Sequence, residues 1–376
     1  MEVRVDKFRD TLNLLKPAIP KKTAIPILKS VLLGDGKAIA TDLQTSVVID
    51  LPEVDEKMLV PHAEVLELLK FVPGNEKLTI ETTAKSIRLS WDGGKAAYPS
   101  ADPADYPKAI PDEKPMVEKD VDGTILVKAL TSMAPYAAKE ESRPVLAGVS
   151  LYLGEQVQAA AGDGFRMVVD NLPLSYPAQH TIIVPNGAIP VIAHVWAKTP
   201  PVAALAASLV QQVTAKRTLN LTLGDGKENA APTWALLRFG KSMVIFKLIQ
   251  GNPPDFKALI PVPTKKVRVM APDFETAVLR VKEIAKENSG IVRLVWTDTE
   301  LTVSAKSEEK GESEAKIPAS ALDGPGHIAL NVSYLVEYLK GKGSFMTFGI
   351  TTEGAPILFQ YPRTPVTVVM PMFVQW

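Results

Sequence analysis

One short motif combines residue types that could do acid-base chemistry. It covers residues 162–166, Gly-Asp-Gly-Phe-Arg, and places the Asp163 carboxyl three positions before the Arg166 guanidinium. An acid beside an arginine can serve catalysis, and the other residues of such a site need not be adjacent in sequence. Locally, glycines on both sides of an aspartate predict a tight hairpin turn, because glycine adopts positive φ without steric cost. The motif therefore predicts a turn and leaves an enzyme as an alternative.

Other patterns typical of catalysis or metal binding are missing from the sequence. The chain has no cysteine, which excludes disulfides, thiolate nucleophiles and every zinc site that uses sulfur. The four histidines are scattered, and we expect surface or helix-cap roles for His62, His180, His194 and His327. The Gly-Asp-Gly sequences at 34–36 and 224–226 follow strand patterns and predict hairpin turns, not phosphate loops. We expect no cofactor and no metal.

The elements that must position any site follow an internal repeat. At 376 residues the chain is too long for one compact domain. Three stretches share one plan of helix, strand, turn, strand and an apolar residue before proline, at residues 6–52, 122–173 and 273–318. A second helix follows each stretch, at 61–72, 186–195 and 331–339. Similar phrases at 105–111 and 255–261 close the first two repeats. We therefore expect three similar domains, at 1–119, 120–261 and 262–376.

Apolar periodicity predicts the type of each element. Residues Phe8, Leu12 and Leu15 share one helix face, as do Phe274, Val278 and Val281. We expect Asp6 and Asp273 to cap these two helices at their N-termini, and Pro17 to end the first. The segments 77–82 and 86–91 alternate apolar and polar residues, which predicts antiparallel strands with one buried face. Helices on one side of antiparallel sheets make an α+β protein.

Charge is balanced over the whole chain but not along it. Basic and acidic residues number 42 each, so the chain is not a polycation that would bind phosphates everywhere. Basic residues gather in 7–22 and acidic residues in 42–67, and the third repeat shows the same order more weakly. A solvated outer face is one interpretation. The repetition favours a protein with one basic and one acidic surface.

The sequence also bears on location. No window approaches the roughly 18–20 uncharged apolar residues that a membrane-spanning helix needs. The first residues carry both signs of charge and lack the pattern of a secretory signal. We therefore expect a soluble, cytoplasmic protein.

Seven short motifs are spread over the chain, and they carry a family resemblance. They are TAIPIL at 23–28, ATDL at 40–43, ESRPVLAGV at 141–149, GDGFRM at 162–167, PDF at 254–256, NVSY at 331–334 and VMPM at 369–372. In order and spacing these motifs resemble bacterial β sliding clamps, the processivity subunit of the replicative DNA polymerase III. The resemblance covers the whole chain.

The resemblance implies a fold and a function. It implies three domains, each a doubled helix-plus-antiparallel-sheet motif, with two chains joined head to tail in a ring around duplex DNA. Such a protein is not an enzyme. It tethers the polymerase catalytic subunit, and it binds the clamp loader and other replication and repair proteins that carry a clamp-binding motif. Two alternatives remain at this point: a clamp-like paralogue of a phage, plasmid or resistance locus with altered partners, and an unrelated three-domain enzyme using Asp163 and Arg166.

The resemblance also implies two sets of site residues. A pocket for partner peptides would be formed by Leu146, Gly162, Gly164, Arg166, Met167, Pro254, Leu259, Asn331, Tyr334, Val368, Met370, Pro371 and Met372. Methionine and proline make an adaptable apolar groove for such peptides. DNA would be met by Lys22 and Arg143, which match basic positions of the family. From charge and helix position alone, we add Lys7, Arg9, Lys198, Arg280, Lys282 and Lys340.

The chain departs from the family pattern in a few places. Members commonly have threonine where Gly162 stands and a basic or polar residue at Ala258. The chain continues past the usual ending through residues 373–376, which would place an extra aromatic residue beside the pocket. Its second domain is longer, with an alanine-rich stretch at 200–213 and a turn at 224–232. These departures make partner specificity the least transferable property.

Overall fold

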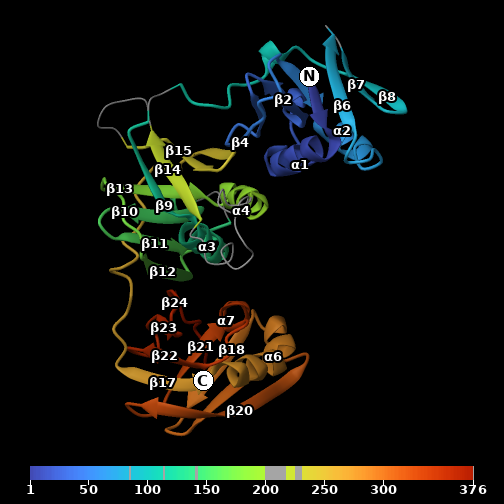
Figure 1. Cartoon of the computed structure of the whole chain (residues 1–376). Coiled ribbons are helices and arrows are strands. Elements are labelled where there is room, and N and C mark those ends of the chain that lie inside the picture. Colours follow the sequence, from blue (N-terminus) through green and yellow to red (C-terminus); the bar gives the residue numbers. More distant parts are fainter. Residues whose placement is uncertain (84–85, 113–114, 140–142, 200–216, 225–230, 376) are drawn as a thin grey trace, which may run out of the picture. The chain divides into compact units, whose positions relative to one another are not determined.

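The computed structural model of the chain forms two compact units (Figure 1). It describes residues 1–376 except 84–85, 113–114, 140–142, 200–216, 225–230 and 376. Unit 1 comprises Met1–Ala134, Ser150–Val157 and Leu172–Gly251, and unit 2 comprises Pro135–Val149, Gln158–Asn171 and Asn252–Trp376. The alanine-rich stretch, most of the turn expected at 224–232 and Trp376 lie outside the described residues.

Unit 1 contains two antiparallel sheets. The smaller has the order β1 (Glu2–Arg4), β6 (Lys77–Thr83), β7 (Ser86–Trp91) and β8 (Gly94–Pro99). The larger has the order β5 (Met58–Pro61), β2 (Ser30–Gly34), β3 (Lys37–Thr41), β4 (Thr45–Asp50), β16 (Ser242–Lys247), β15 (Trp234–Phe239), β14 (Thr218–Gly224) and β9 (Val117–Asp122). The helices of unit 1 that the structure describes are α1 (Val5–Leu15), α2 (His62–Leu68), α3 (Gly123–Met133) and α4 (Ala188–Lys198). The hairpin expected at 34–36 is confirmed, since β2 and β3 pair across it.

Unit 2 is built on nine strands in one antiparallel order. They are β12 (Arg166–Leu172), β24 (Val366–Val369), β23 (Ile357–Gln360), β22 (Phe345–Ile350), β17 (Lys265–Met270), β20 (Gly311–Leu322), β19 (Glu300–Ser307), β18 (Ile291–Trp296) and β21 (Gly326–Asn331). Strand β20 pairs with β19 along 311–318 and with β17 along 319–322, so one long strand joins the two halves of this sheet. The other strands that the structure describes are β10 (Gly148–Leu153), β11 (Val157–Gly162) and β13 (His180–Pro185).

Two helices cover the sheet of unit 2. Helix α6 (Ala271–Glu287) packs against α7 (Val332–Leu339) and against β18, β19 and β20 (Figure 1). The predicted apolar face of α6 is confirmed, because Phe274, Val278 and Val281 are fully buried in the core. In unit 1 the face of α1 formed by Phe8, Leu12 and Leu15 is equally buried. Helices on antiparallel sheets confirm the α+β class.

The two predicted helix caps are wrong. Helix α1 begins at Val5, so Asp6 lies in its first turn, and α6 begins at Ala271, so Asp273 lies in its first turn. Each helix follows a strand directly, and distant backbone satisfies its first N–H groups. The amides of Val5 and Asp6 donate to the carbonyls of Glu76 and Gly74, and that of Ala271 donates to Ser344. With those donors already paired, no side-chain cap is needed.

Candidate functional site

The motif at 162–166 is a tight turn between β11 and β12 in unit 2, as its glycines predict. One oxygen of Asp163, Oδ1, accepts hydrogen bonds from the backbone amides of Phe165 and Arg166, each at 2.9 Å. Gly164 has φ of +92°, a conformation that side chains with a Cβ rarely adopt. The aspartate therefore holds the turn in shape and points Phe165 outward, where its side chain is 64% exposed.

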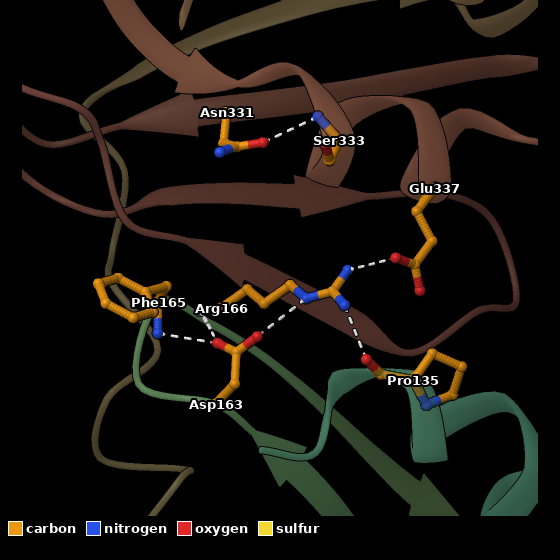
Figure 2. Close-up of polar contacts among 7 residues, drawn as sticks. All are labelled: Pro135, Asp163, Phe165, Arg166, Asn331, Ser333 and Glu337. Atoms are coloured by element: carbon orange, nitrogen blue, oxygen red, sulfur yellow. Dashed lines mark hydrogen bonds and ion pairs between the residues drawn. The ribbon is translucent and has the colours of Figure 1, made fainter. Parts of the chain in front are cut away.

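The Arg166 side chain turns inward and connects several segments of unit 2 (Figure 2). Its Nε lies 3.3 Å from Asp163 Oδ2, its Nη1 donates to Glu337 Oε2 at 2.8 Å, and its Nη2 donates to the Pro135 carbonyl at 2.7 Å. The guanidinium also lies 4.7 Å from the ring centre of Tyr136 and 4.6 Å from that of Tyr334. Arg166 thus ties the turn to α7, which is far away in sequence.

The electrostatics of this cluster do not favour a catalytic acid-base pair. Burial acts to lower the pKa of Arg166, but the hydrogen bond and charge of Glu337, together with Asp163, outweigh it and raise that pKa above its usual value. The guanidinium therefore stays charged, with both carboxylates bonded to it. This arrangement suits positioning of the turn, because three partners fix the guanidinium and an arginine does not give up its proton in a protein.

A cavity of about 170 Å³ opens beside this turn, within unit 2. Its lining is almost entirely apolar and consists of Leu146, Gly162, Gly164, Phe165, Arg166, Met167, Pro254, Phe256, Leu259, Pro356, Val368 and Met370. The structure thus brings together nine of the thirteen residues named from the sequence. Strand pairing brings the two halves of the lining together, because Met167 of β12 lies opposite Val368 of β24.

The cavity has a buried floor and an exposed apolar rim. Leu146, Phe256, Met167 and Val368 are each less than 10% exposed and form the floor. The rim consists of side chains with large exposed surfaces, Phe165 at 64%, Leu259 at 56% and Met370 at 45%. A backbone hydrogen bond of 2.7 Å from Met370 N to Phe165 O joins the two sides of the rim. Exposed apolar side chains around a hollow are typical of a surface that binds another molecule.

Three lining residues were missed from the sequence. Phe165 and Phe256 belong to the motifs at 162–167 and 254–256, but the sequence does not show that their side chains face the cavity. Pro356 belongs to no motif, and no signal in the sequence points to it. Phe256 also explains why glycine stands at 162: a Cβ there would lie 2.8 Å from the Phe256 ring and 3.0 Å from the Met167 Cβ.

Four predicted pocket residues lie outside the lining and support it instead. The Asn331 side chain accepts a 2.9 Å hydrogen bond from Ser333 N and caps α7 (Figure 2). Tyr334 contacts the Arg166 guanidinium. Pro371 and Met372 continue from Met370, and Met372 N donates to the Ala329 carbonyl at 2.8 Å.

The basic residues of unit 1 that are predicted to contact DNA differ in whether their side chains already bind other groups of the unit. Lys22 is exposed in the loop after α1, and Lys198 is exposed in the last turn of α4. Lys7 forms an ion pair with Glu53, and Arg9 donates to the Leu69 carbonyl at 3.2 Å. Lys7 and Arg9 are therefore already used within the unit, which makes them weaker candidates for phosphate contacts.

Unit 2 holds the other predicted DNA contacts. Arg280 and Lys282 lie on α6 and Lys340 follows α7, with Arg280 and Lys340 exposed. Arg143 is also exposed, but its Nη1 would lie 2.7 Å from a Cβ built on Gly164. The structure therefore places the Arg143 guanidinium against the turn that borders the cavity.

Three of the four histidines have contacts that fit the expected cap or surface roles, and His180, at the start of β13, is half-buried. His62 Nε2 contacts the Leu12 carbonyl at 2.9 Å and His194 Nε2 contacts the Asn13 carbonyl at 2.8 Å, so both satisfy the end of α1. His327 forms an ion pair with Glu353 on the surface of unit 2. Over the described part of the chain, no group of three or more histidine, aspartate or glutamate side chains could hold a metal ion.

Comparison with known proteins identifies the fold. Residues 257–372 match the family model of the DNA polymerase III beta subunit, C-terminal domain. The chain is 24% identical to the beta sliding clamp of Caulobacter vibrioides, over 96% of this chain and 93% of that protein. It is 22% identical to that of Escherichia coli K12, over 96% and 97%. The resemblance inferred from the seven motifs is thereby confirmed.

Solved structures agree over the full length. A DNA polymerase sliding clamp from Pseudomonas aeruginosa superposes with a TM-score of 0.85 at 19% identity, covering 100% of this chain and 99% of that one. The beta subunit from Thermotoga maritima gives 0.84 at 19% identity, with the same coverage. The chain therefore has the DNA sliding clamp fold. Among the helices that the structure describes, none is long and apolar enough to cross a membrane.

Proposed function

We propose that this protein is a DNA sliding clamp, which encircles duplex DNA and tethers the replicative polymerase and other replication and repair proteins to it. The observation that carries this proposal is the apolar cavity of unit 2, built around Arg166 in a chain with the clamp fold throughout. We further propose that the protein is a processivity subunit without catalytic activity of its own, because Asp163, Glu337 and the Pro135 carbonyl together hold the Arg166 guanidinium in a structural role.

The cavity suits a short peptide with one or two large apolar side chains. Its floor is built on two paired strands, β12 and β24, which carry Met167 and Val368. Its rim carries Met370 and Leu259, whose flexible side chains can adapt to different occupants. Partners would therefore insert apolar anchors into the floor and differ in the residues that cross the rim. This is how one site can serve a polymerase, a loader and several repair proteins.

A sliding clamp must stay on DNA while binding its phosphates only weakly. Strong phosphate contacts would resist sliding, because each neutralised phosphate releases counterions and adds affinity. The chain has equal numbers of acidic and basic residues, and its exposed Lys22, Lys198 and Arg280 lie on or beside helices. We propose that such helices face the DNA and that topology supplies the retention.

The ring would form from two chains, each with three domains divided near residues 119 and 261. Strand β8 ends its sheet, and residues 311–318 of β20 pair only with β19 among the described strands. An unpaired strand edge is a template for another strand. We propose that β8 of one chain pairs with residues 311–318 of β20 in the second.

Solution mass tests the ring. Analytical ultracentrifugation at micromolar concentration should find a stable species with twice the 40.7 kDa mass of one chain. A strictly monomeric protein would contradict the proposal. The measurement also separates a clamp from the three-domain enzyme considered first, which has no need to dimerise. A scattering envelope with a central hole would support the ring directly.

Peptide binding tests the cavity. Replacing Met370 and Met372 with alanine should weaken binding of the host polymerase's clamp-binding peptide about tenfold or more, because the apolar contact of Met370 at the rim is lost and the neighbouring Met372 side chain is removed with it. Leu279→Ala is the matched control, since Leu279 is 45% exposed on α6 and outside the cavity. Equal affinity of the double variant and the control would remove the site, while an intact dimer mass shows that folding is preserved.

A second candidate is a clamp-like paralogue with altered partners. The observation that favours it is Phe256, which fills the space beside Gly162 where members of the family commonly carry threonine. A paralogue of this kind should dimerise and retain circular DNA, yet bind the host polymerase peptide poorly. Tight binding of that peptide would eliminate this alternative.

A further inference from the structure

One face of the sheet of unit 2 carries exposed basic and apolar side chains together. Helices α6 and α7 cover the other face, where Val267, Val269 and Met346 are buried with them in the core (Figure 1). Because side chains alternate along a strand, Lys266 and Arg268 of β17 point away from these helices. Both residues are exposed. The face opposite α6 and α7 therefore presents two cations to solvent, and we call it the open face.

Two apolar side chains flank these cations. Leu322 of β20 lies opposite Lys266 and is 58% exposed, and Phe345 of β22 lies opposite Met270 and is 44% exposed. Because the residues next to them in each strand pack into the core, both side chains point to the open face. We call Lys266, Arg268, Leu322 and Phe345 the open-face patch.

The cations of the patch are not neutralised within the unit. Lys316, elsewhere on β20, pairs with Glu300, whereas neither Lys266 nor Arg268 forms an ion pair with a carboxylate of the described residues. The Arg268 guanidinium lies instead 4.4 Å from the centre of the Phe345 ring. A guanidinium stacked on a ring is held in place, and the N–H groups at its edge stay available. The patch therefore offers a pre-oriented donor to an oxyanion.

The registers of three strands give the shape of the patch. Phe345 lies beside Met270, and Leu322 lies beside Lys266, four residues earlier on β17. Four residues cover about 13 Å along a strand, and the two apolar side chains are two strands, or about 10 Å, apart. The patch is thus a diagonal line about 16 Å long with Arg268 near its middle, and an extended peptide covers it with about five or six residues.

The chemistry of the patch fits an acidic peptide better than single-stranded DNA. Side chains two positions apart in an extended peptide lie about 7 Å apart on one side, which matches the spacing of Arg268 and Lys266 on β17. Proteins that bind single-stranded DNA stack successive bases on aromatic rings, whereas this patch has one ring and the aliphatic Leu322. Asp323 is exposed directly after Leu322 and would repel a continuous chain of phosphates.

The patch is separate from the cavity, although both lie on the open face. Gly349 of β22 lies opposite both Lys266 and Leu358, and Leu358 lies opposite Val368 of the cavity floor. Pro263 covers the position between the two sites, since a Cβ built on Gly349 would lie 2.7 Å from the Pro263 Cβ. A molecule bound at the patch therefore needs no contact with the cavity.

We propose that the open-face patch binds an acidic segment of a partner protein that also carries a leucine or phenylalanine. In this extended segment the apolar side chain covers Phe345, and acidic side chains two and four positions along pair with Arg268 and Lys266. The methylene groups of the last acidic residue pack beside Leu322. Exposed ion pairs are individually weak and are screened by salt, so the patch is an auxiliary contact of low affinity.

Peptide binding to the full-length protein tests the patch. The probe is a fluorescein-labelled peptide with the core Leu-Ser-Glu-Ser-Glu in a glycine- and serine-rich sequence, and a second probe has glutamine in place of both glutamates. Fluorescence anisotropy at low ionic strength measures the affinities of the wild-type protein and of the double variant Lys266→Gln/Arg268→Gln. The matched control is Arg238→Gln/Lys247→Gln, which removes two exposed charges from strands of unit 1.

The acidic probe should bind the wild-type protein and the control equally. It should bind Lys266→Gln/Arg268→Gln roughly fivefold more weakly, because two exposed ion pairs are lost. The glutamine probe should bind the wild-type protein more weakly by the same factor and should not distinguish the two proteins, because the ion pairs are already absent. Raised salt should remove the difference between the wild-type protein and the variant.

Three outcomes would overturn the inference. Equal affinity of Lys266→Gln/Arg268→Gln and the control for the acidic probe would show that the probe binds elsewhere. Failure of that probe to bind the wild-type protein would remove the site. Tighter binding of a labelled oligothymidylate, lost in the patch variant but kept in Lys22→Glu, would assign the patch to single-stranded DNA. The ring and the cavity are tested by dimer mass and by Met370 and Met372, so these outcomes leave the proposed function standing.

Discussion

Replacement of Arg166 by alanine should lower the free energy of unfolding by about 2–4 kcal/mol. Breaking a fully buried ion pair costs roughly 3–5 kcal/mol because the remaining charge is stranded. Here the Arg166 side chain is 7% exposed and that of Asp163 is 19% exposed. The Glu337 side chain is 41% exposed, so water can solvate its carboxylate, and the Arg166–Glu337 ion pair contributes little to the cost. The Pro135 carbonyl would lose its guanidinium donor, which costs about 1–3 kcal/mol.

Two aromatic contacts add to this loss. The rings of Tyr136 and Tyr334 lie within 5 Å of the guanidinium carbon, and each such contact is worth about 0.5–1 kcal/mol. Contributions within one network are not additive, which is why the expected total stays below their sum. Arg166→Lys should fall between the wild-type protein and Arg166→Ala, because an ammonium is a point charge and cannot form the fork of bonds to several partners.

Urea unfolding followed by circular dichroism measures the effect, together with peptide affinity by anisotropy. Arg238→Ala is the matched control, since Arg238 is exposed on β15 of unit 1 and should change stability by less than about 0.5 kcal/mol. Equal stability of Arg166→Ala and the control would refute the claim that the network holds the turn. A loss of stability with unchanged peptide affinity would refute the claim that Arg166 positions the cavity wall.

Three further predictions concern other residues. Gly162→Thr should cost about 1–3 kcal/mol and weaken peptide binding, because its Cβ would meet the Phe256 ring. Phe256→Ala removes a buried ring and should cost less stability in the Gly162→Thr background than in the wild-type protein; equal costs in the urea assay would contradict this account. Burial lowers the pKa of His62, so as pH falls the unfolded state binds a proton at this residue before the folded state does. The contribution of neutral His62 to the free energy of unfolding should therefore be complete above about pH 6.5 and decline as pH falls below that value. His62→Gln should flatten this dependence, and an unchanged slope would exclude His62 as its source. Lys22→Glu should shorten retention on nicked circular DNA in a salt-dependent way with unfolding unchanged, whereas the exposed control Lys306→Glu on β19 should not; equal retention would mean that DNA passes elsewhere.

Local patterns in the sequence determined much of the secondary structure. The period of Phe8, Leu12 and Leu15 required one buried helix face, and the structure has it. The Gly-Asp-Gly sequence at 162–164 required a turn, since aspartate bonds to nearby amides and glycine adopts positive φ. Such signals act over a few residues, so they can be read without knowing the rest of the fold.

The family motifs carried information that local physics does not. They placed Leu146, Met167, Leu259 and Met370 in one pocket, although these residues are far apart in the chain. No periodicity or composition relates such positions. Only their order and spacing, matched to a known family, predicted that they meet.

Tertiary structure alone decided the remaining features. The helix starts at Val5 and Ala271 were misplaced because distant carbonyls satisfy their amides. Glu337 was missed because it stands 171 positions from Arg166, on a helix whose exposed face looks ordinary in sequence. Each feature arises from a long-range contact, whose partners are chosen by how the strands pair and the helices pack.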